Sequence, residues 1–248
     1  MASSDPLLPL LDLPGVGDAA EAARDAVDRL LRHRVLRRGG EAVSAESALR
    51  GARASAALDG VDLPLDTVRS GSSDPVVQGA LRVGAAVGRL VGTWERAPAQ
   101  ALARLHVLAA AGREPGDALG RPSVDDPGAA GRLAALARQV AAGTSAPAAV
   151  LAAVVHGELL APSPFRTGGG LVARAAVRLT VSARGLDRRG VSVPEVGHVE
   201  LGAEYQAALA DYATGRPDGV ARWVRHCCAA IELGAGEGLA ICEALARG

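Results

Sequence analysis

The chain contains no lysine and no asparagine, so all 27 of its basic residues are arginines. Without lysine there is no P-loop lysine, no Schiff-base lysine and no kinase-type lysine for ATP. Without asparagine there is no Cys-His-Asn triad and no oxyanion hole built on asparagine. The codon bias of a GC-rich genome explains the composition, but the exclusions hold whatever its origin.

Aromatic side chains are scarce as well, at 2% of 248 residues, and the formal net charge is zero. Few stacking platforms and no excess positive charge argue against nucleic acid as a partner. The apolar share of 49% is enough for a sizeable core in one large domain or two small ones.

The three cysteines include the adjacent pair Cys227 and Cys228, and they form neither a disulfide framework nor a CxxC zinc motif. The N-terminus is acidic and proline-rich, unlike a signal peptide, and the longest apolar run, 146–155, is half a membrane span. We therefore expect a soluble, cytoplasmic protein without a metal site or a membrane partner.

Apolar residues recur at helical spacing through most of the chain, and no segment alternates like a sheet strand. We expect an all-α fold with an N-terminal extension, 1–44, that carries one helix, and a helical domain over 45–246. A loop is expected at 113–128. The expected helices are 18–38, 45–58, 75–94, 98–111, 129–142, 147–160, 170–184, 198–213, 217–233 and 236–246.

The first expected helix ends in a basic cluster. Arg37 and Arg38 precede Gly39 and Gly40, a pair that favours a helix stop. Together with the basic residues at 32–34, these arginines form either a basic patch or a solvated helix end that the helix dipole favours, and the second reading is preferred.

The most informative segment is 163–174, Ser-Pro-Phe-Arg-Thr-Gly-Gly-Gly-Leu-Val-Ala-Arg. Gly168, Gly169 and Gly170 open the helix expected at 170–184, and Arg174 follows one turn later. Free N–H groups at a helix start favour an anion, so these four residues are candidates for phosphate binding, and an ordinary glycine-rich turn is the alternative reading.

This segment resembles, without a gap, the signature H-P-F-x-[D/E]-G-N-G-R-x-x-R of the Fic (Fido) family. A histidine stands seven residues upstream at His156, and the resemblance extends to the segment from Leu105-His106 to Arg121 and to Tyr205, Gly215 and Trp223. It implies a Fic-like helical domain in which the signature loop enters a central helix. Active members transfer AMP from a nucleotide to a protein hydroxyl.

The resemblance also assigns roles, and several are lost here. The general base falls on Ser163, the acidic Mg²⁺ ligand on Thr167, the phosphate-binding Asn on Gly169 and the first Arg on Leu171. The second Arg is retained as Arg174. Histidine and arginine are used freely elsewhere, with 5 and 27 copies, so composition does not explain their absence from the signature.

A second family feature has a counterpart upstream. The self-inhibiting motif [S/T]-x-x-x-E-[G/N] is matched by Ser55, Asp59 and Gly60, with Asp in place of Glu. The resemblance implies an ion pair between Asp59 and Arg174, for which the shorter side chain requires a closer approach or a bridging water. A plain helix end in Asp-Gly is the alternative reading.

Other candidates are interpreted structurally. We expect His156 to be structural and not a replacement base, the Cys pair to pack in the core, and Glu195, His198 and Glu200 to belong to a helix start and not to a metal site. The short, Pro/Gly-rich segment 113–128 argues against docking of a target by strand addition.

The sequence predicts a Fic-fold pseudoenzyme that binds a protein partner or regulates one, with at most residual nucleotide or phosphate binding. The partner is unidentified, and a homodimer is possible. The alternative is a divergent protein AMP-transferase, and only that alternative requires ATP with Mg²⁺ as a cofactor.

Overall fold

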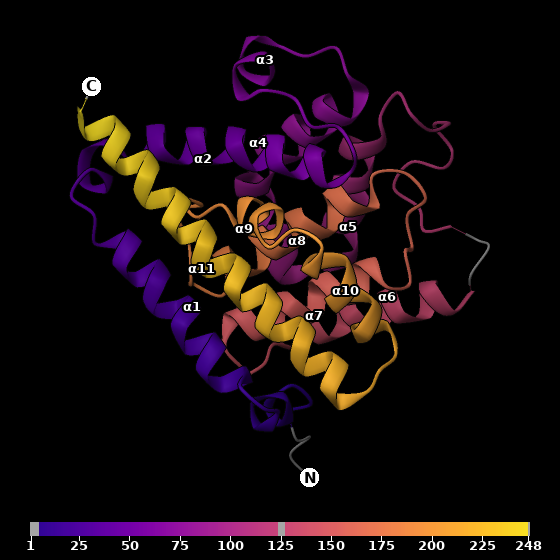
Figure 1. Ribbon diagram of the computed structural model, residues 1–248. Coiled ribbons are helices and arrows are strands. Elements are labelled where there is room, and N and C mark those ends of the chain that lie inside the picture. The colour runs from indigo at the N-terminus through magenta and orange to yellow at the C-terminus, as the bar shows by residue number, and fades with distance from the viewer. Residues whose placement is uncertain (1–4, 124–126, 248) are drawn as a thin grey trace.

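The structure, a computed structural model, describes residues 5–123 and 127–247, and these fold into a helical assembly (Figure 1). Within them the only β feature is an isolated bridge between Ala111 and Glu114. The elements are the short 3-10 helix η1 Leu8–Asp12, α1 Val16–Leu31, α2 Leu36–Leu58, α3 Leu65–Ser70, α4 Pro75–Arg96, α5 Pro98–Ala110, α6 Pro127–Ala142, α7 Ala148–Leu160, α8 Gly169–Ala183, α9 Pro194–Glu200, α10 Glu204–Ala213 and α11 Pro217–Arg247.

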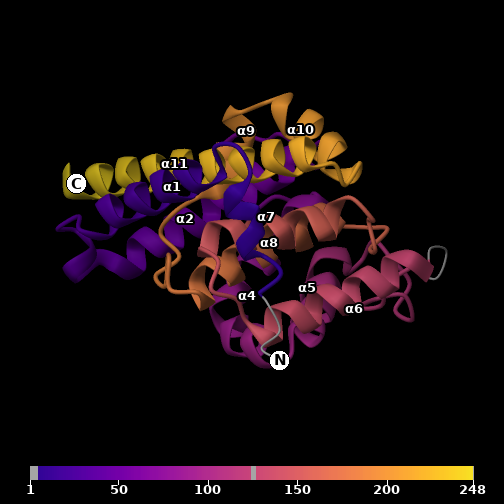
Figure 2. The same ribbon diagram turned by 90° about the horizontal axis from the view of Figure 1, so that it is seen from below.

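Helix α8 forms the centre of the fold. Every residue from Leu171 to Val181 is buried, and the helix contacts α2, α4, α5 and α7. The long α11 crosses one face and packs on α1, α9 and α10, as two perpendicular views show (Figures 1 and 2). An amphipathic helix buries one stripe, whereas α8 is buried all round, so whatever α8 carries is held rigidly.

Helices α4 to α8 begin and end within three residues of the predicted ranges. Asp74 caps α4 by accepting hydrogen bonds from the N–H groups of Val76 and Val77, at 2.8 and 3.1 Å. Pro75 and Pro98 occupy first turns, where the missing N–H has no intrahelical partner to lose. The predicted end of the helix at Leu58 is also confirmed.

The helix predicted at 18–38 is present as α1, but its predicted end is wrong. Helix α1 ends at Leu31 and α2 begins at Leu36, so Arg37 and Arg38 open a helix instead of closing one. The glycine pair does not end α2, although Gly39 kinks it with a φ of −109°. The turn lets α1 pack on α11 while α2 packs on α4 and α9. The boundary expected after residue 44 falls inside α2, and the division into extension and domain stays a prediction.

The predicted helix 45–58 begins earlier, at Leu36, and three other predicted ranges need correction. The predicted helix 198–213 is two helices, α9 and α10, which are separated by a turn with Gly202 at a φ of +57°. The predicted pair 217–233 and 236–246 is the single helix α11. Helix α3 was not predicted. No helix in the described ranges is long and apolar enough to cross a membrane.

Candidate functional site around the signature loop

The loop at 161–168 joins α7 to α8 and is anchored by its single phenylalanine. Phe165 is 3% exposed and stacks on the ring of His106 in α5, with ring centroids 4.4 Å apart. The backbone N–H of Ser123 donates to the carbonyl of Pro164 at 2.7 Å. Phe165 therefore fixes the loop to the core.

His106 ties the loop to the segment that follows α5. The N–H of Gly120 donates to its Nδ1 at 3.0 Å, so Nε2 carries the proton and donates to the carbonyl of Thr167 at 3.1 Å. Burial lowers the pKa of His106, and the nearby Glu114 opposes this effect only in part. The lowered pKa keeps the ring neutral, as its two hydrogen bonds require. The sequence marked His106 only through the family resemblance.

Ser163, at the position of the signature histidine, is exposed and has a φ of +45°, an unusual conformation for a residue other than glycine. Its side chain is a hydroxyl, which lacks the basic nitrogen of an imidazole. Thr167, at the position of the acidic Mg²⁺ ligand, is half-buried and offers a neutral hydroxyl. The structure therefore presents no carboxylate or imidazole at either position.

The three glycines open α8 as predicted, and two of them are needed for close approach. Gly168 caps the helix with a φ of +69° and lies against Ala109. A methyl group on Gly170 would overlap the Asp59 carboxylate and the Arg174 guanidinium. Gly169 has room for one. The first hydrogen bond within the helix is donated by the N–H of Val172 to the carbonyl of Gly168, at 3.0 Å. The N–H groups of the three residues between them have no acceptor inside the helix.

Arg174 is 3% exposed, and its guanidinium is bound by the chain itself. Nε donates to Ser55 Oγ at 2.7 Å, while Nη2 donates to the Ser55 carbonyl at 2.9 Å and to Asp59 Oδ1 at 2.5 Å. Nη1 reaches the hydroxyl of Tyr205 at 3.5 Å. The ion pair implied by the family resemblance is present, and it is direct. The Asp59 side chain compensates for its shorter length by lying against the bare backbone of Gly170.

Leu171 occupies the position of the first signature arginine, and it is a core residue at 1% exposure. Its side chain lies beside Gly79 of α4, where an added methyl group would meet both Leu171 and the Ala109 carbonyl. This position faces the α4–α8 contact, so it offers no polar group to a ligand.

His156 lies in a buried aromatic and imidazole cluster on the far side of Arg174. Its Nε2 is 2.9 Å from Tyr205 Oη, and its ring packs at 5.1 Å on Trp223 and at 4.9 Å on His198. Burial holds the pKa of His156 well below its usual value, and the positive charge of Arg174 lowers it further. The structural interpretation of His156 fits this geometry.

The cysteine pair is part of the same core. Cys227 Sγ is 3.9 Å from His156 Nδ1, and burial raises the pKa of Cys227 well above its usual value and that of Cys228 to about 12. A thiol that stays protonated at neutral pH is a poor nucleophile. The pair packs in the core, as expected.

Glu195 and His198 both lie in α9 but face different partners. Glu195 Oε1 pairs with Arg178 Nε at 3.2 Å, and His198 Nδ1 is 3.0 Å from His226 Nε2. No group of three histidine, cysteine or acidic side chains suited to a metal ion occurs in residues 5–123 and 127–247. The sequence did not indicate the buried Arg178–Glu195 pair.

A cavity of about 590 Å³ borders the outer side of the loop. Thr167 is the predicted site residue that reaches it, whereas Arg174, Asp59 and Ser55 lie together in the interior. Part of the predicted loop 113–128 forms its other wall, and residues 124–126 of that loop lie outside the described ranges. The polar lining residues are His106, Glu114, Asp117, Arg121, Ser123, Arg166 and Thr167.

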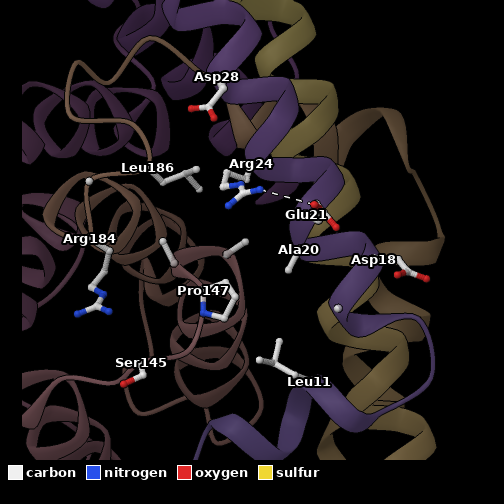
Figure 3. A pocket seen from close by; sticks show the side chains of 14 residues that line it. Leu11, Asp18, Ala20, Glu21, Arg24, Asp28, Ser145, Pro147, Arg184 and Leu186 are labelled. Carbon is white, nitrogen blue, oxygen red and sulfur yellow. Dashed lines mark ion pairs between the residues drawn. The ribbon is translucent and has the colours of Figure 1, made fainter.

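A second cavity, of about 690 Å³, lies between α1 and the start of α7 (Figure 3). Its rim carries Arg24, which pairs with Glu21 at 3.6 Å, and Arg184 from the end of α8. The signature loop joins the opposite ends of α7 and α8, about 20 Å away along a helix of this length. This cavity is therefore separate from the signature residues.

The architecture matches solved structures. A Fic family protein from Desulfovibrio desulfuricans G20 superposes with a TM-score of 0.74 at 17% identity, over 92% of this chain and 74% of that one. The chain has the Fic fold. A fragment of Fic-1 from C. elegans superposes with a TM-score of 0.68 at 18% identity, over 94% of this chain and 74% of that one. No protein-family model and no curated protein sequence matches the chain.

Proposed function

We propose that this Fic-fold chain is a cytoplasmic pseudoenzyme, a protein-binding or regulatory module with at most residual affinity for a nucleotide or phosphate. The observation that carries the proposal is the state of Arg174, the one charged signature residue that remains. Its guanidinium is buried and bound by Ser55, Asp59 and Tyr205.

A phosphate at the start of α8 would have to compete with Asp59. The carboxylate lies against Gly170 and pairs with Arg174 at 2.5 Å, so it holds the positive charge that the phosphate needs. A phosphate bound to the same guanidinium would lie close to the Asp59 carboxylate, and the two negative charges would repel each other. Residual phosphate binding at Gly168, Gly169, Gly170 and Arg174 therefore requires Asp59 to move.

The residues present fit Mg²⁺-ATP poorly. Thr167 is a neutral oxygen ligand where Mg²⁺ prefers a carboxylate. Leu171 is buried in the α4–α8 contact and adds no charge for a triphosphate. Ser163 is no general base at neutral pH, a loss that typically lowers a rate 10²–10⁴-fold. Scaffold residues have been kept while the groups that perform chemistry have not.

The second candidate function, a divergent protein AMP-transferase, is favoured by the cavity beside Thr167. This cavity brings Glu114, Asp117 and Arg121 to the outer side of the signature loop. Carboxylates and a guanidinium are groups that bind a cation and a phosphate, so a different base and a different donor site are chemically available there.

Thermal-shift measurements with ATP, GTP, CDP-choline and a UDP-sugar, each with and without Mg²⁺, separate the two functions. The pseudoenzyme predicts no Mg²⁺-dependent rise in melting temperature and no transfer of label from radioactive nucleotide to protein. A Mg²⁺-dependent rise together with labelled protein would establish the transferase. In that case Glu114→Gln should abolish transfer, and the exposed control Glu95→Gln on α4 should not.

A further inference from the structure

Four arginines cluster where α1 gives way to α2. Arg32, Arg34, Arg37 and Arg38, here called the arginine corner, are all exposed. Among the described residues none of them makes an ion pair, although Arg24 before them pairs with Glu21 and Arg50 after them pairs with Glu46. Between 29 and 40 there is no acidic residue, and the two carboxylates that flank this range, Asp28 and Glu41, form no ion pair with the corner among the described residues. The corner therefore carries a net positive charge, and its guanidinium groups are without ion-pair partners there.

Helix electrostatics explain only part of the arginine corner, because Arg32 caps the C-terminal end of α1, where a cation is favoured, but Arg37 and Arg38 do not share that setting. Arg37 and Arg38 lie in the first turn of α2, next to the positive end of the helix dipole. A cation is disfavoured there, where an aspartate or glutamate would be stabilising. The local structure is thus weakened by these two residues, whereas an anion brought to the same place would be attracted by the guanidinium groups and by the positive end of the helix dipole. The first N–H groups of α2 already donate to carbonyls of the preceding turn, so the guanidinium groups would be the donors to that anion.

An apolar groove of about 550 Å³ lies beside the corner, between α2 and the C-terminal end of α11. One of its walls includes Leu245, which is 44% exposed and is one of two large hydrophobic side chains exposed within residues 5–123 and 127–247. The apolar lining residues, here called the α2–α11 groove, are Ala42, Ala45, Leu49, Ile241, Ala244 and Leu245.

The corner and the groove form one continuous surface. Ala42, Ala45 and Leu49 follow each other at steps of three and four residues, which is the spacing of one helix face, and Arg38 stands four residues before Ala42, across the kink at Gly39. Both views show the end of α1, the start of α2 and the end of α11 together, on the side opposite α5 and α6 (Figures 1 and 2). A segment lying in the groove would therefore extend over Arg38.

The charges at the other end of the groove are already paired. Glu46 accepts from Arg50 and from Arg69 at 2.8 Å each, and Arg50 also donates to Glu237 at 2.6 Å. Of the arginines that line this groove or form the corner beside it, those without an ion pair among the described residues lie at the end where α2 begins. This asymmetry specifies the orientation of an occupant, with its acidic end over the corner and its apolar side chains between Ala45 and Leu245.

We propose that the α2–α11 groove and the arginine corner bind an amphipathic segment of a partner protein whose acidic end faces Arg34, Arg37 and Arg38. The inference rests on the proposed role as a protein-binding module and names the chemistry of that partner. Nucleic acid fits less well, because all five aromatic side chains are buried and no base can stack on the surface. A membrane surface also fits less well, because the groove is concave and Leu245 is its one large hydrophobic side chain that is exposed.

The test uses fluorescence anisotropy with the full chain and a labelled helical peptide. The peptide carries glutamate in its first turn and leucine on one face of the remaining turns. A matched peptide replaces each glutamate with glutamine. We expect the acidic peptide to bind at least tenfold more tightly than its glutamine match, and the difference to shrink as salt is added.

Three variants locate the binding. Arg37→Glu with Arg38→Glu and, separately, Leu245→Glu should each weaken acidic-peptide binding at least tenfold. The control Arg104→Glu with Arg138→Glu makes the same charge change on α5 and α6, at exposed positions, and should leave binding unchanged. All the substituted side chains are exposed, so the variants should fold, as their melting curves will show.

Absence of peptide binding, or equal binding by the corner and control variants, overturns the proposal. Equal affinity for single-stranded DNA or phosphatidylserine vesicles, lost in the corner variant but not in Leu245→Glu, overturns it in favour of a general anion surface. Self-association in sedimentation that Leu245→Glu abolishes overturns it in favour of a second copy in the groove. If the nucleotide experiment is negative and the peptide does not bind, the groove assignment fails while the pseudoenzyme proposal stands.

Discussion

Asp59 and Arg174, separated by 115 residues in the chain, meet at 2.5 Å between the end of α2 and the first turns of α8. Arg174 is almost wholly buried, and the side chain of Asp59 is 19% exposed. Ser55, four residues before Asp59, supplies a hydroxyl and a carbonyl to the same guanidinium. The end of α2 is therefore fastened to the central helix by one charged group with several partners.

Breaking this pair should unfold the protein more readily. Asp59→Ala leaves a buried guanidinium without its carboxylate, and removing one partner of a buried pair typically costs about 3 kcal/mol or more. Urea denaturation should show the loss as a lower midpoint. Asp62→Ala is the control: it removes the carboxylate that pairs with Arg53, and the side chain of Asp62 is 68% exposed. This substitution should change the free energy of unfolding by less than about 1 kcal/mol. Equal effects of the two substitutions would contradict the structural role of the Asp59 pair.

The neighbouring glycines should respond in opposite directions. Gly170→Ala forces a methyl group against Asp59 and Arg174, so it should destabilise the chain by about 1–3 kcal/mol. Gly169→Ala meets only the Cβ of Phe165 at 3.8 Å, an ordinary contact, and should be neutral or stabilise by up to about 0.5 kcal/mol. Thermal unfolding of both variants beside the parent measures the difference. A harmless alanine at Gly170 would show that the close approach is not required.

The signature loop was predictable from the sequence because its chemistry is local. A proline, a phenylalanine and three glycines at fixed spacing indicate a turn that enters a helix, and Phe165 and Gly168 take those places. The Asp59–Arg174 contact was predictable only through the family resemblance, because no local rule relates residues 115 positions apart.

The errors in the helix assignments have tertiary causes. Arg37-Arg38-Gly39-Gly40 favours a helix end, but burial of Leu36 against the core begins α2 before that point. The basic cluster was visible in the sequence, but its place in the first turn of α2 was not predicted. Helix polarity depends on where the chain turns, and the turn at 32–35 is set by packing of α1 on α11.

Acid should weaken the fold before most carboxylates titrate. Burial lowers the pKa of His226 to about 4 and holds that of His198 well below the usual 6.5. In the unfolded chain these rings take up protons as the pH falls through about 6.5, whereas the folded chain resists protonation. The folded chain therefore binds fewer protons than the unfolded chain below about pH 6.5. The free energy of unfolding is highest above that pH and falls as the pH is lowered from about 6.5 to 4.

The pH effect can be assigned with one variant. His226→Gln removes a ring whose Nδ1 is buried without a hydrogen-bond partner. Its unfolding free energy should depend less steeply on pH between 6.5 and 4 than that of the parent. The control is His33, a half-buried histidine in the turn between α1 and α2 that lies outside the buried cluster, and the contribution of the cluster to the slope should persist when glutamine replaces it. Parallel curves for all three proteins would exclude the buried cluster as the source.

Helix α11 gives a test of why the sequence suggested two helices where there is one. Gly234 and Gly238 lie against other backbone: a methyl group at Gly234 would overlap Val193 and Pro194, and one at Gly238 would overlap Leu30 and the Val191 carbonyl. Gly236 has nothing within 4 Å. Gly236→Ala should therefore stabilise the chain by about 1 kcal/mol through helix propensity alone. Gly234→Ala should destabilise it by about 1–3 kcal/mol, because backbone cannot move aside as a side chain can. Chemical denaturation of the two variants measures these changes in stability. If both glycines only weakened the helix, alanine would raise the free energy of unfolding at both positions.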